Sequence, residues 1–377
     1  MISLKHILVA CVLLLTTFDY AGAQRPRPSP TATPAPSRSE QEPVRVFTEE
    51  VRLPVVAVDQ YGHYDPTVEP EDILVLEDGV AQEIRSIRRI PPNVVLVLDT
   101  GGELSGLGGQ SKRTSLTRDT AINILQRLRP GTSVTVMQFN NRVETISGWT
   151  TDVRATQIAL KKKVSSGKRS TFGDALAAAA RELITRPEGS RHVVLITDGV
   201  ESGGKIDRSE AIKQLLAVRA TVHVVSYTEF VRQWKGNLPA NVRGGQRPTS
   251  SDPITSTDPT LPPGTTRNPT FGVDLRFDPK MRRQRRAYEE DVKESQLILA
   301  QMTSETGGQL LLPKSTAEMI AQARSVAKEI GAEYVLTYRP KRPLAQAKAG
   351  EYRSVEVASR RVGLNVRSRR GYVVPVQ

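Results

Sequence analysis

The stretch "NVVLVLDTGG" (Asn93–Gly102) runs from continuous apolar residues into an aspartate, a threonine and two glycines. An apolar run without alternation is typical of a strand that is buried on both faces, as in a parallel sheet. Ligands of open parallel sheets bind beyond the carboxyl ends of the strands, and Asp99 stands at such an end. The stretch therefore predicts a central strand that carries a candidate functional carboxylate.

Strand and helix patterns alternate along the chain after this stretch. The patterns predict helices over 115–130, 154–164, 172–185, 208–218, 288–308 and 315–331, strands over 192–197, 221–227 and 309–313, and a hairpin over 133–147. Such alternation predicts an α/β fold with a mostly parallel, doubly wound sheet and helices on both of its faces. We place this sheet domain at residues 92–331.

Two flanking segments show the alternation that is typical of half-buried strands. Residues 44–91 contain "VRVFTEEVRLPVVAVD" and "DILVLEDG", and residues 332–377 contain "AEYVLTYRP", "EYRSVEVASR" and "VGLNVRSRRGYVVP". A β unit as small as the N-terminal segment has little core of its own. We therefore expect the N-terminal and C-terminal segments to join in one small β accessory domain beside the sheet.

Residues 1–23 resemble an export signal, in which a basic start precedes the apolar run Ile7–Leu15 and small residues at Ala21–Ala23 offer a cleavage site. Residues 24–43, rich in proline, serine and threonine, predict a disordered linker. We expect an exported protein, periplasmic or secreted, with no transmembrane anchor after signal cleavage. Cleavage also removes Cys11, the only cysteine, and with it any disulfide or thiol chemistry.

Residues 229–286 interrupt the α/β pattern. They are dense in proline, glycine, serine and threonine and end in the basic run "RFDPKMRRQRRAY", so we expect a flexible insertion without secondary structure. The net charge of +13 favours anionic partners. An anionic envelope polymer is one candidate partner, and a solvated arm without a partner is the alternative. Export and the small number of interleaved aromatic residues argue against nucleic acid. The candidate docking residues are Arg282, Arg283, Arg285 and Arg286.

Three kinds of chemistry compete at Asp99. An aspartic peptidase needs two carboxylates that share a proton, but Asp198 lies in the reversed order Thr-Asp-Gly. A phosphate loop needs glycine spacings that "DTGGELSGLGGQSK" does not have. The third reading is a hard-cation site, because Mg²⁺ prefers oxygen ligands. Asp198 also ends an apolar strand, so the two carboxylates can meet at one edge of the sheet.

Three separated motifs resemble a von Willebrand factor type A domain: the corner "DTGGE", the helix start "STFGDAL" and the strand end "TDG". In that family the first loop reads Asp-x-Ser-x-Ser, the second supplies a threonine and the third an aspartate. Together they form a metal-ion-dependent adhesion site. The resemblance implies that Asp99 and Asp198 are metal ligands, with Ser170 at the threonine position and Thr171 as an adjacent substitute.

The first loop departs from the family pattern at both serines, which makes this adhesion site degenerate. Gly101 stands at one serine position and Glu103 at the other, so two hydroxyl ligands are absent. Three outcomes are open: Glu103 supplies a carboxylate suited to Ca²⁺ or Mn²⁺, water fills the gaps around a cation such as Mg²⁺, or the site holds no metal and Asp99 only shapes the corner. The candidate metal ligands are Asp99, Glu103, Ser170 and Asp198.

The resemblance covers roughly residues 44–375, apart from the insertion, and extends to a bacterial family of exported proteins that is frequent in acidobacteria. It implies protein binding and no established enzymatic activity. No Gly-x-Ser-x-Gly elbow occurs, and His63, His192 and His223 have no second ligand at metal spacing. We therefore expect a non-enzymatic binding protein with a protein or matrix partner. The competing hypothesis is a scaffold that binds polyanions through residues 229–286.

Overall fold

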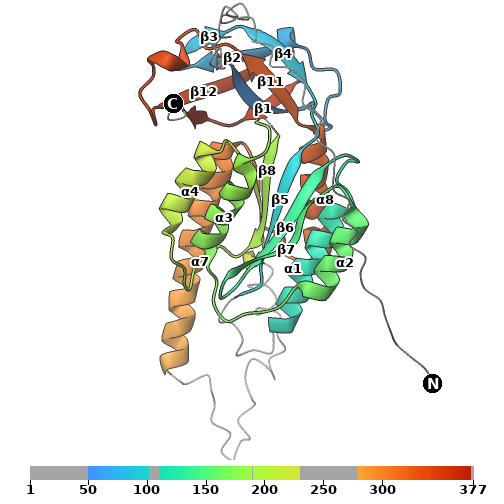
Figure 1. Cartoon of the computed structure of the whole chain (residues 1–377), viewed down its shortest axis with the longest axis vertical. Coiled ribbons are helices and arrows are strands. Elements are labelled where there is room, and N and C mark those ends of the chain that lie inside the picture. The colour runs from blue at the N-terminus through green and yellow to red at the C-terminus, as the bar shows by residue number, and fades with distance from the viewer. Residues whose placement is uncertain (1–49, 102–109, 189, 230–278, 375–377) are drawn as a thin grey trace, which may run out of the picture. The chain divides into compact units, whose positions relative to one another are not determined.

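A six-stranded sheet forms the centre of the part of the chain that the computed structural model describes, residues 50–101, 110–188, 190–229 and 279–374. Its strands are β5 (Asn93–Asp99), β6 (Ser133–Phe139), β7 (Val143–Thr150), β8 (Arg191–Thr197), β9 (Thr221–Ser226) and β10 (Leu310–Leu311). They lie in the order β10-β9-β8-β5-β6-β7 (Figure 1). All neighbours are parallel except β6 and β7, which form the predicted antiparallel hairpin.

Helices cover both faces of this sheet (Figure 1). They are α1 (Gln110–Leu125), α2 (Val153–Lys163), α3 (Phe172–Ile184), α4 (Arg208–Ala217), α7 (Pro279–Thr306) and α8 (Thr316–Ala332). On one face α3, α4 and α7 share an apolar core with Val95 and Val97 of β5. On the other face α1, α2 and α8 share a second core with Val94 and Leu96. Alternate residues of β5 thus enter opposite cores, which explains why the run has no polar position.

Strands from both sides of the sheet domain in the sequence make the accessory β unit. The first set is β1 (Val51–Val58), β2 (Ile73–Glu77), β3 (Val80–Gln82) and β4 (Ile84–Arg88), and the second is β11 (Tyr334–Tyr338), β12 (Tyr352–Ser359), β13 (Asn365–Ser368) and β14 (Gly371–Val373). They form two four-stranded sheets, β13-β1-β11-β4 and β14-β12-β2-β3, around a shared apolar core. The predicted fold class, an α/β sheet with an accessory β unit, is confirmed.

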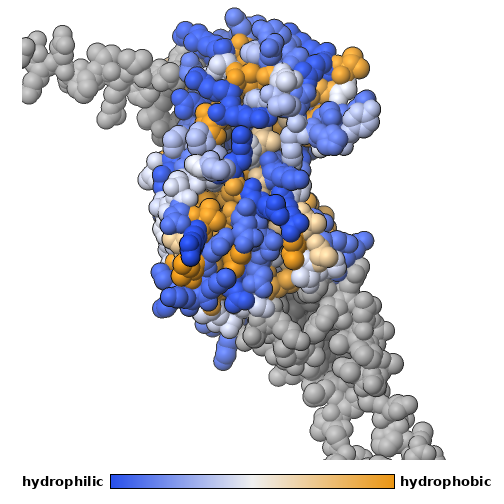
Figure 2. All heavy atoms as spheres, turned by 90° about the vertical axis from the view of Figure 1, so that its right-hand side faces the viewer, coloured by the Kyte–Doolittle hydropathy of each residue, from blue (hydrophilic) through white to orange (hydrophobic). Residues whose placement is uncertain are grey.

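The solvent-facing side of α2 and its neighbours is mostly hydrophilic, with apolar side chains between the polar ones (Figure 2). In α2 the buried residues are Thr156 and Leu160, whereas Lys161, Lys162 and Lys163 lie at its exposed end. This division is the amphipathic pattern expected of a helix that covers a sheet. Among the described residues, none of the helices combines the length and hydropathy needed to cross a bilayer.

Helix α7 begins earlier than the sequence indicated. The expectation that residues 229–286 have no secondary structure is wrong for residues 279–286, because α7 begins at Pro279. Arginine, lysine, methionine and glutamine favour helices, and proline is well suited to the first helical position. The four candidate docking arginines, Arg282, Arg283, Arg285 and Arg286, therefore lie on this helix.

Several predictions fall on residues that the structure does not describe. These are the export signal (1–23), the linker (24–43), the rest of the insertion (230–278) and the candidate ligand Glu103. They stay predictions.

Candidate functional site

Asp99 is the last residue of β5, Asp198 follows the neighbouring parallel strand β8, and both are buried, with 2% and 4% of their surface exposed. The Oδ2 atom of Asp99 accepts hydrogen bonds from Thr197 Oγ1 at 2.7 Å and from Ser170 Oγ at 3.4 Å. Ser170 precedes α3 and is also buried. The structure thus brings together the ends of β5 and β8 and the start of α3. We call Asp99, Ser170 and Asp198 the strand-end site.

The first loop turns tightly behind Asp99. The Gly101 backbone N–H donates to Asp99 Oδ1 at 3.1 Å, which closes a turn on the aspartate side chain. A Cβ atom at Gly101 would lie only 1.8 Å from the backbone oxygen of Arg169. A serine therefore cannot stand at position 101 unless the second loop moves. The packing of the first loop against the second therefore requires a glycine at position 101. The absence of a serine there removes a metal ligand of the family pattern, but it also has this steric reason.

The second loop, which leads into α3, is fixed by hydrogen bonds to the ends of β5 and β6. The Gly167 N–H donates to the Thr100 carbonyl at 3.0 Å. The Asn141 Oδ1 atom accepts from the backbone N–H groups of Lys168 at 3.2 Å and Arg169 at 3.0 Å. The side chains of Lys168 and Arg169 are exposed. The loop therefore presents two cations on a backbone that is held in place.

The third loop is joined to the second by a reciprocal pair of hydrogen bonds. The Ser170 N–H donates to Ser202 Oγ at 2.8 Å, and the Ser202 N–H donates to the Ser170 carbonyl at 3.1 Å. The carboxylate of Asp198 accepts from the Val200 N–H at 3.1 Å. Asp198 thereby shapes its own loop in the way that Asp99 shapes the first. All three loops at this edge of the sheet are tied to one another.

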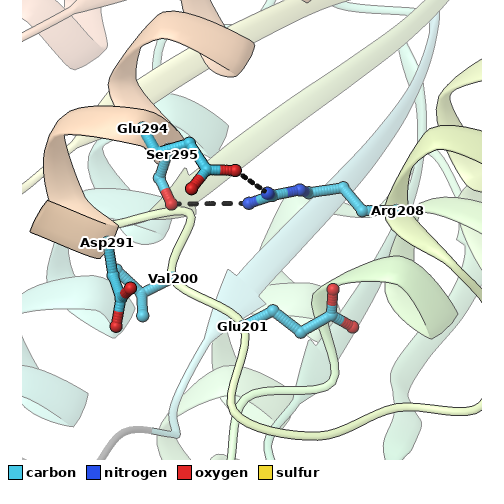
Figure 3. Close-up of a pocket in the computed structure, with 6 residues that line it drawn as sticks. All are labelled: Val200, Glu201, Arg208, Asp291, Glu294 and Ser295. Carbon is cyan, nitrogen blue, oxygen red and sulfur yellow. Dashed lines mark hydrogen bonds and ion pairs between the residues drawn. The ribbon is translucent and has the colours of Figure 1, made fainter. Parts of the chain in front are cut away.

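A pocket of about 110 Å³, the third-loop pocket, lies between the third loop and α7 (Figure 3). Arg208 crosses it from α4 and donates to Glu294 Oε1 at 3.1 Å and to Ser295 Oγ at 3.5 Å. Glu201 accepts from the Gly173 N–H at 3.2 Å, and burial raises the pKa of its carboxyl group. The pocket is therefore polar and partly acidic, and the carboxylates of Glu201 and Glu294 already accept hydrogen bonds. Its lining residues are Val200, Glu201, Arg208, Asp291, Glu294 and Ser295.

Sequence reasoning missed three residues that hold the site together: Asn141, Thr197 and Ser202. Thr197 carried a signal, since it is the last residue of the strand before Asp198 and so lies beside the end of β5. Asn141 lies in the β6–β7 turn and Ser202 in the third loop, and their partners are 27 to 32 residues away. No local pattern predicts such pairs.

The described residues fit a metal ion poorly. They offer two carboxylates, the hydroxyl of Ser170 and the buried, unpaired hydroxyl of Thr171, whereas Mg²⁺ takes six oxygen ligands and Ca²⁺ six to eight, so water would have to supply the rest. Asp99 already accepts from Thr197 and Gly101, and position 101 has no room for the hydroxyl ligand of the family pattern. Within the described ranges, no group of three or more histidine, cysteine, aspartate or glutamate side chains is arranged to hold a metal. Glu103 lies outside those ranges.

Comparison with known proteins gives one family and several similar structures. Residues 93–239 match the model of the von Willebrand factor type A domain. The chain is 23% identical to inter-alpha-trypsin inhibitor heavy chain H1 from Mesocricetus auratus over 38% of its own length. That match spans 17% of the relative, so the two proteins share one region only.

Among solved structures, the chain resembles a von Willebrand factor type A protein from Catenulispora acidiphila, at 11% identity and a TM-score of 0.43 over 82% of this chain and 74% of that one. It also resembles proximal thread matrix protein 1 from the mussel byssus, whose adhesion-site motif holds zinc, at 20% identity and a TM-score of 0.32 over 36% of each chain. The strand that carries Asp99 begins the family match, at residue 93. Residues 93–239 of this chain therefore resemble a von Willebrand factor type A domain.

Proposed function

We propose that this chain is an exported, non-enzymatic binding protein whose type A domain takes a protein or matrix partner at the loops around the strand-end site. Type A domains are interaction modules, which supports binding over catalysis. The partner would contact the exposed residues of the loops, since Asp99, Ser170 and Asp198 are themselves buried. Their role in the proposal is to hold the loops in one arrangement.

One observation carries this proposal: a single buried carboxylate, Asp99, joins segments that are 71 and 98 residues away in the sequence. It does so at the edge of a parallel sheet where open α/β folds bind their ligands. A rigid set of loops lowers the entropy that a partner must lose on binding, because the contact surface is already ordered. Lys168 and Arg169 project from that surface and favour a partner with acidic groups.

A divalent cation is the second part of the hypothesis, with Asp99, Glu103, Ser170 and Asp198 as its ligands and Mg²⁺, Ca²⁺ or Mn²⁺ as the ion. From the poor fit of the described residues we expect isothermal calorimetry to give no binding heat at millimolar concentrations of any of the three ions. A saturable heat that disappears in the Asp99→Ala variant would contradict this expectation.

Polyanion binding through the basic insertion is the competing function. The clustering of Arg282, Arg283, Arg285 and Arg286 in the sequence of α7 favours it, because closely spaced cations together attract a polyanion. Affinity capture from the envelope of the producing organism separates the two functions. Material that is lost on replacing these four arginines by serine, and that is released by salt, supports the polyanion function. Material that stays bound after these replacements supports partner binding by the type A domain.

A further inference from the structure

A pair of buried histidines lies at the end of the sheet opposite to Asp99. His192 on β8 and His223 on β9 are 1% and 0% exposed, and their rings stack with centroids 6.1 Å apart. The two strands are parallel neighbours, and both histidines lie near the starts of their strands. The two histidines make no contact that is part of the strand-end site, so their burial needs another explanation.

Two glutamates from the end of α8 and one arginine from the accessory β unit face this pair. His192 Nε2 lies 3.3 Å from Glu333 Oε1, and His223 Nδ1 lies 3.7 Å from Glu329 Oε1. Glu329 also forms an ion pair with Arg367 of β13, which links the sheet domain to the accessory unit. Burial raises the pKa of Glu329. The other charged or titratable groups that act on these glutamates are Tyr64 and Arg369.

The hydrogen bonding of the histidines is incomplete. Neither ring nitrogen of His223 has a hydrogen-bond partner, and His192 Nδ1 has none, although all three atoms are buried. A neutral imidazole always carries one N–H, so His223 leaves a buried donor unsatisfied at a cost of about 1–3 kcal/mol. A proton on His223 would place a charge 3.7 Å from the carboxylate of Glu329. The folded site thus leaves a neutral His223 with an unpaired N–H, and burial beside His192 and Arg367 lowers the pKa of the ring, so the protonated form is disfavoured as well.

We infer that this cluster is a proton-sensitive joint, in which His223 takes up a proton only when β13 separates from α8, so that acid loosens the joint. At neutral pH Glu329 is left to Arg367, and the accessory unit is held to the sheet domain. A proton on His223 would place a second cation, beside Arg367, against a carboxylate that already has a partner.

The pH range follows from the environment of His223. Burial, the neighbouring His192 and Arg367 hold the pKa of His223 well below 6.5, the ordinary value for histidine. A base whose folded-state pKa is lowered contributes stability that is present above the unfolded pKa and is lost as the pH falls below it. The raised pKa of Glu329 acts oppositely on global stability, because its protonated form is favoured in the fold. A variant of His223 isolates the histidine contribution.

The test uses hydrogen exchange of the β13 amides, corrected for the intrinsic rate, between pH 7.5 and pH 5. For the wild type we expect exchange to become up to about thirtyfold faster at pH 5, since the unfolded pKa lies 1.5 units above that pH. The His223→Gln variant keeps a neutral polar side chain, and we expect it to lose most of this acid response. The matched control, His63→Gln, removes an exposed histidine and should respond like the wild type.

An acid response of His223→Gln equal to that of the wild type would overturn the inference. If His223→Gln does not fold, Arg367→Gln provides the second test. This variant removes the ion pair that joins β13 to α8, so β13 should exchange rapidly at both pH values. Slow, pH-independent exchange of β13 in Arg367→Gln would equally overturn the inference. Neither outcome depends on partner binding, so a failure of this inference would not contradict the proposed binding function.

Discussion

Replacement of Arg353 by leucine is expected to lower the free energy of unfolding by about 3–5 kcal/mol, because it leaves a buried carboxylate without its cation. Arg353 is fully buried in the accessory unit and pairs with Glu77 at 2.8 Å. The other oxygen of Glu77 accepts from the hydroxyls of Tyr338 at 2.6 Å and Tyr372 at 3.0 Å. Urea denaturation followed by circular dichroism measures the loss.

Two further variants show whether the charge pair is responsible. Replacing both partners, Glu77→Leu with Arg353→Met, removes the unpaired charge and should cost less than Arg353→Leu alone. Arg52→Leu on β1 changes an exposed arginine of the same unit and should stay within about 0.5 kcal/mol of the wild type. If Arg353→Leu were as mild as Arg52→Leu, the buried pair would not be holding the accessory unit together.

Gly101→Ser is expected to destabilise the protein by about 1–3 kcal/mol and to confer no metal binding, although it restores a serine of the family pattern. The new Cβ would lie 1.8 Å from the Arg169 carbonyl oxygen, which is backbone and cannot rotate away. The second loop would have to leave its hydrogen bonds to Asn141 and Thr100. Thermal unfolding and calorimetry with Mg²⁺ measure the two effects.

Gly148→Ser is the matched control, because a Cβ atom at Gly148 on β7 meets nothing within 4 Å. We expect this variant to be much milder than Gly101→Ser. Wild-type stability of Gly101→Ser together with a Mg²⁺ isotherm would show that the second loop yields easily. The site would then be one substitution away from a working metal site, contrary to the geometry described above.

The sequence was sufficient to predict the fold because its strongest signals are local. The unbroken apolar run of β5, the β6–β7 hairpin and the helix boundaries of α2 and α3 follow from periodicity and from residues next to each other. The start of α7 was missed because proline-rich composition upstream outweighed good helix formers in "PKMRRQRR". Composition averaged over a long window conceals a helix that begins near its end.

The candidate site was only partly predictable. Strand ends placed Asp99 and Asp198 at one edge, and the motif placed Ser170 beside them, where it bonds to Asp99. The close approach of the Arg169 backbone to Gly101 depends on where the second loop is anchored, and Asn141 provides that anchor from another hairpin. Such contacts arise from the packing of three loops, so they have no signature in any one of them.

The proposed binding surface depends most directly on Lys168 and Arg169, the exposed residues of the loop that Asp99 and Asn141 hold in place. The decisive measurement is the amount of envelope partner captured by Lys168→Glu/Arg169→Glu relative to Lys161→Glu/Lys162→Glu, which makes the same charge change at the exposed end of α2. The account predicts that the first variant loses at least about tenfold in capture, which corresponds to 1.4 kcal/mol, while the second retains wild-type capture. Equal capture by both variants, with wild-type stability in each, would contradict it.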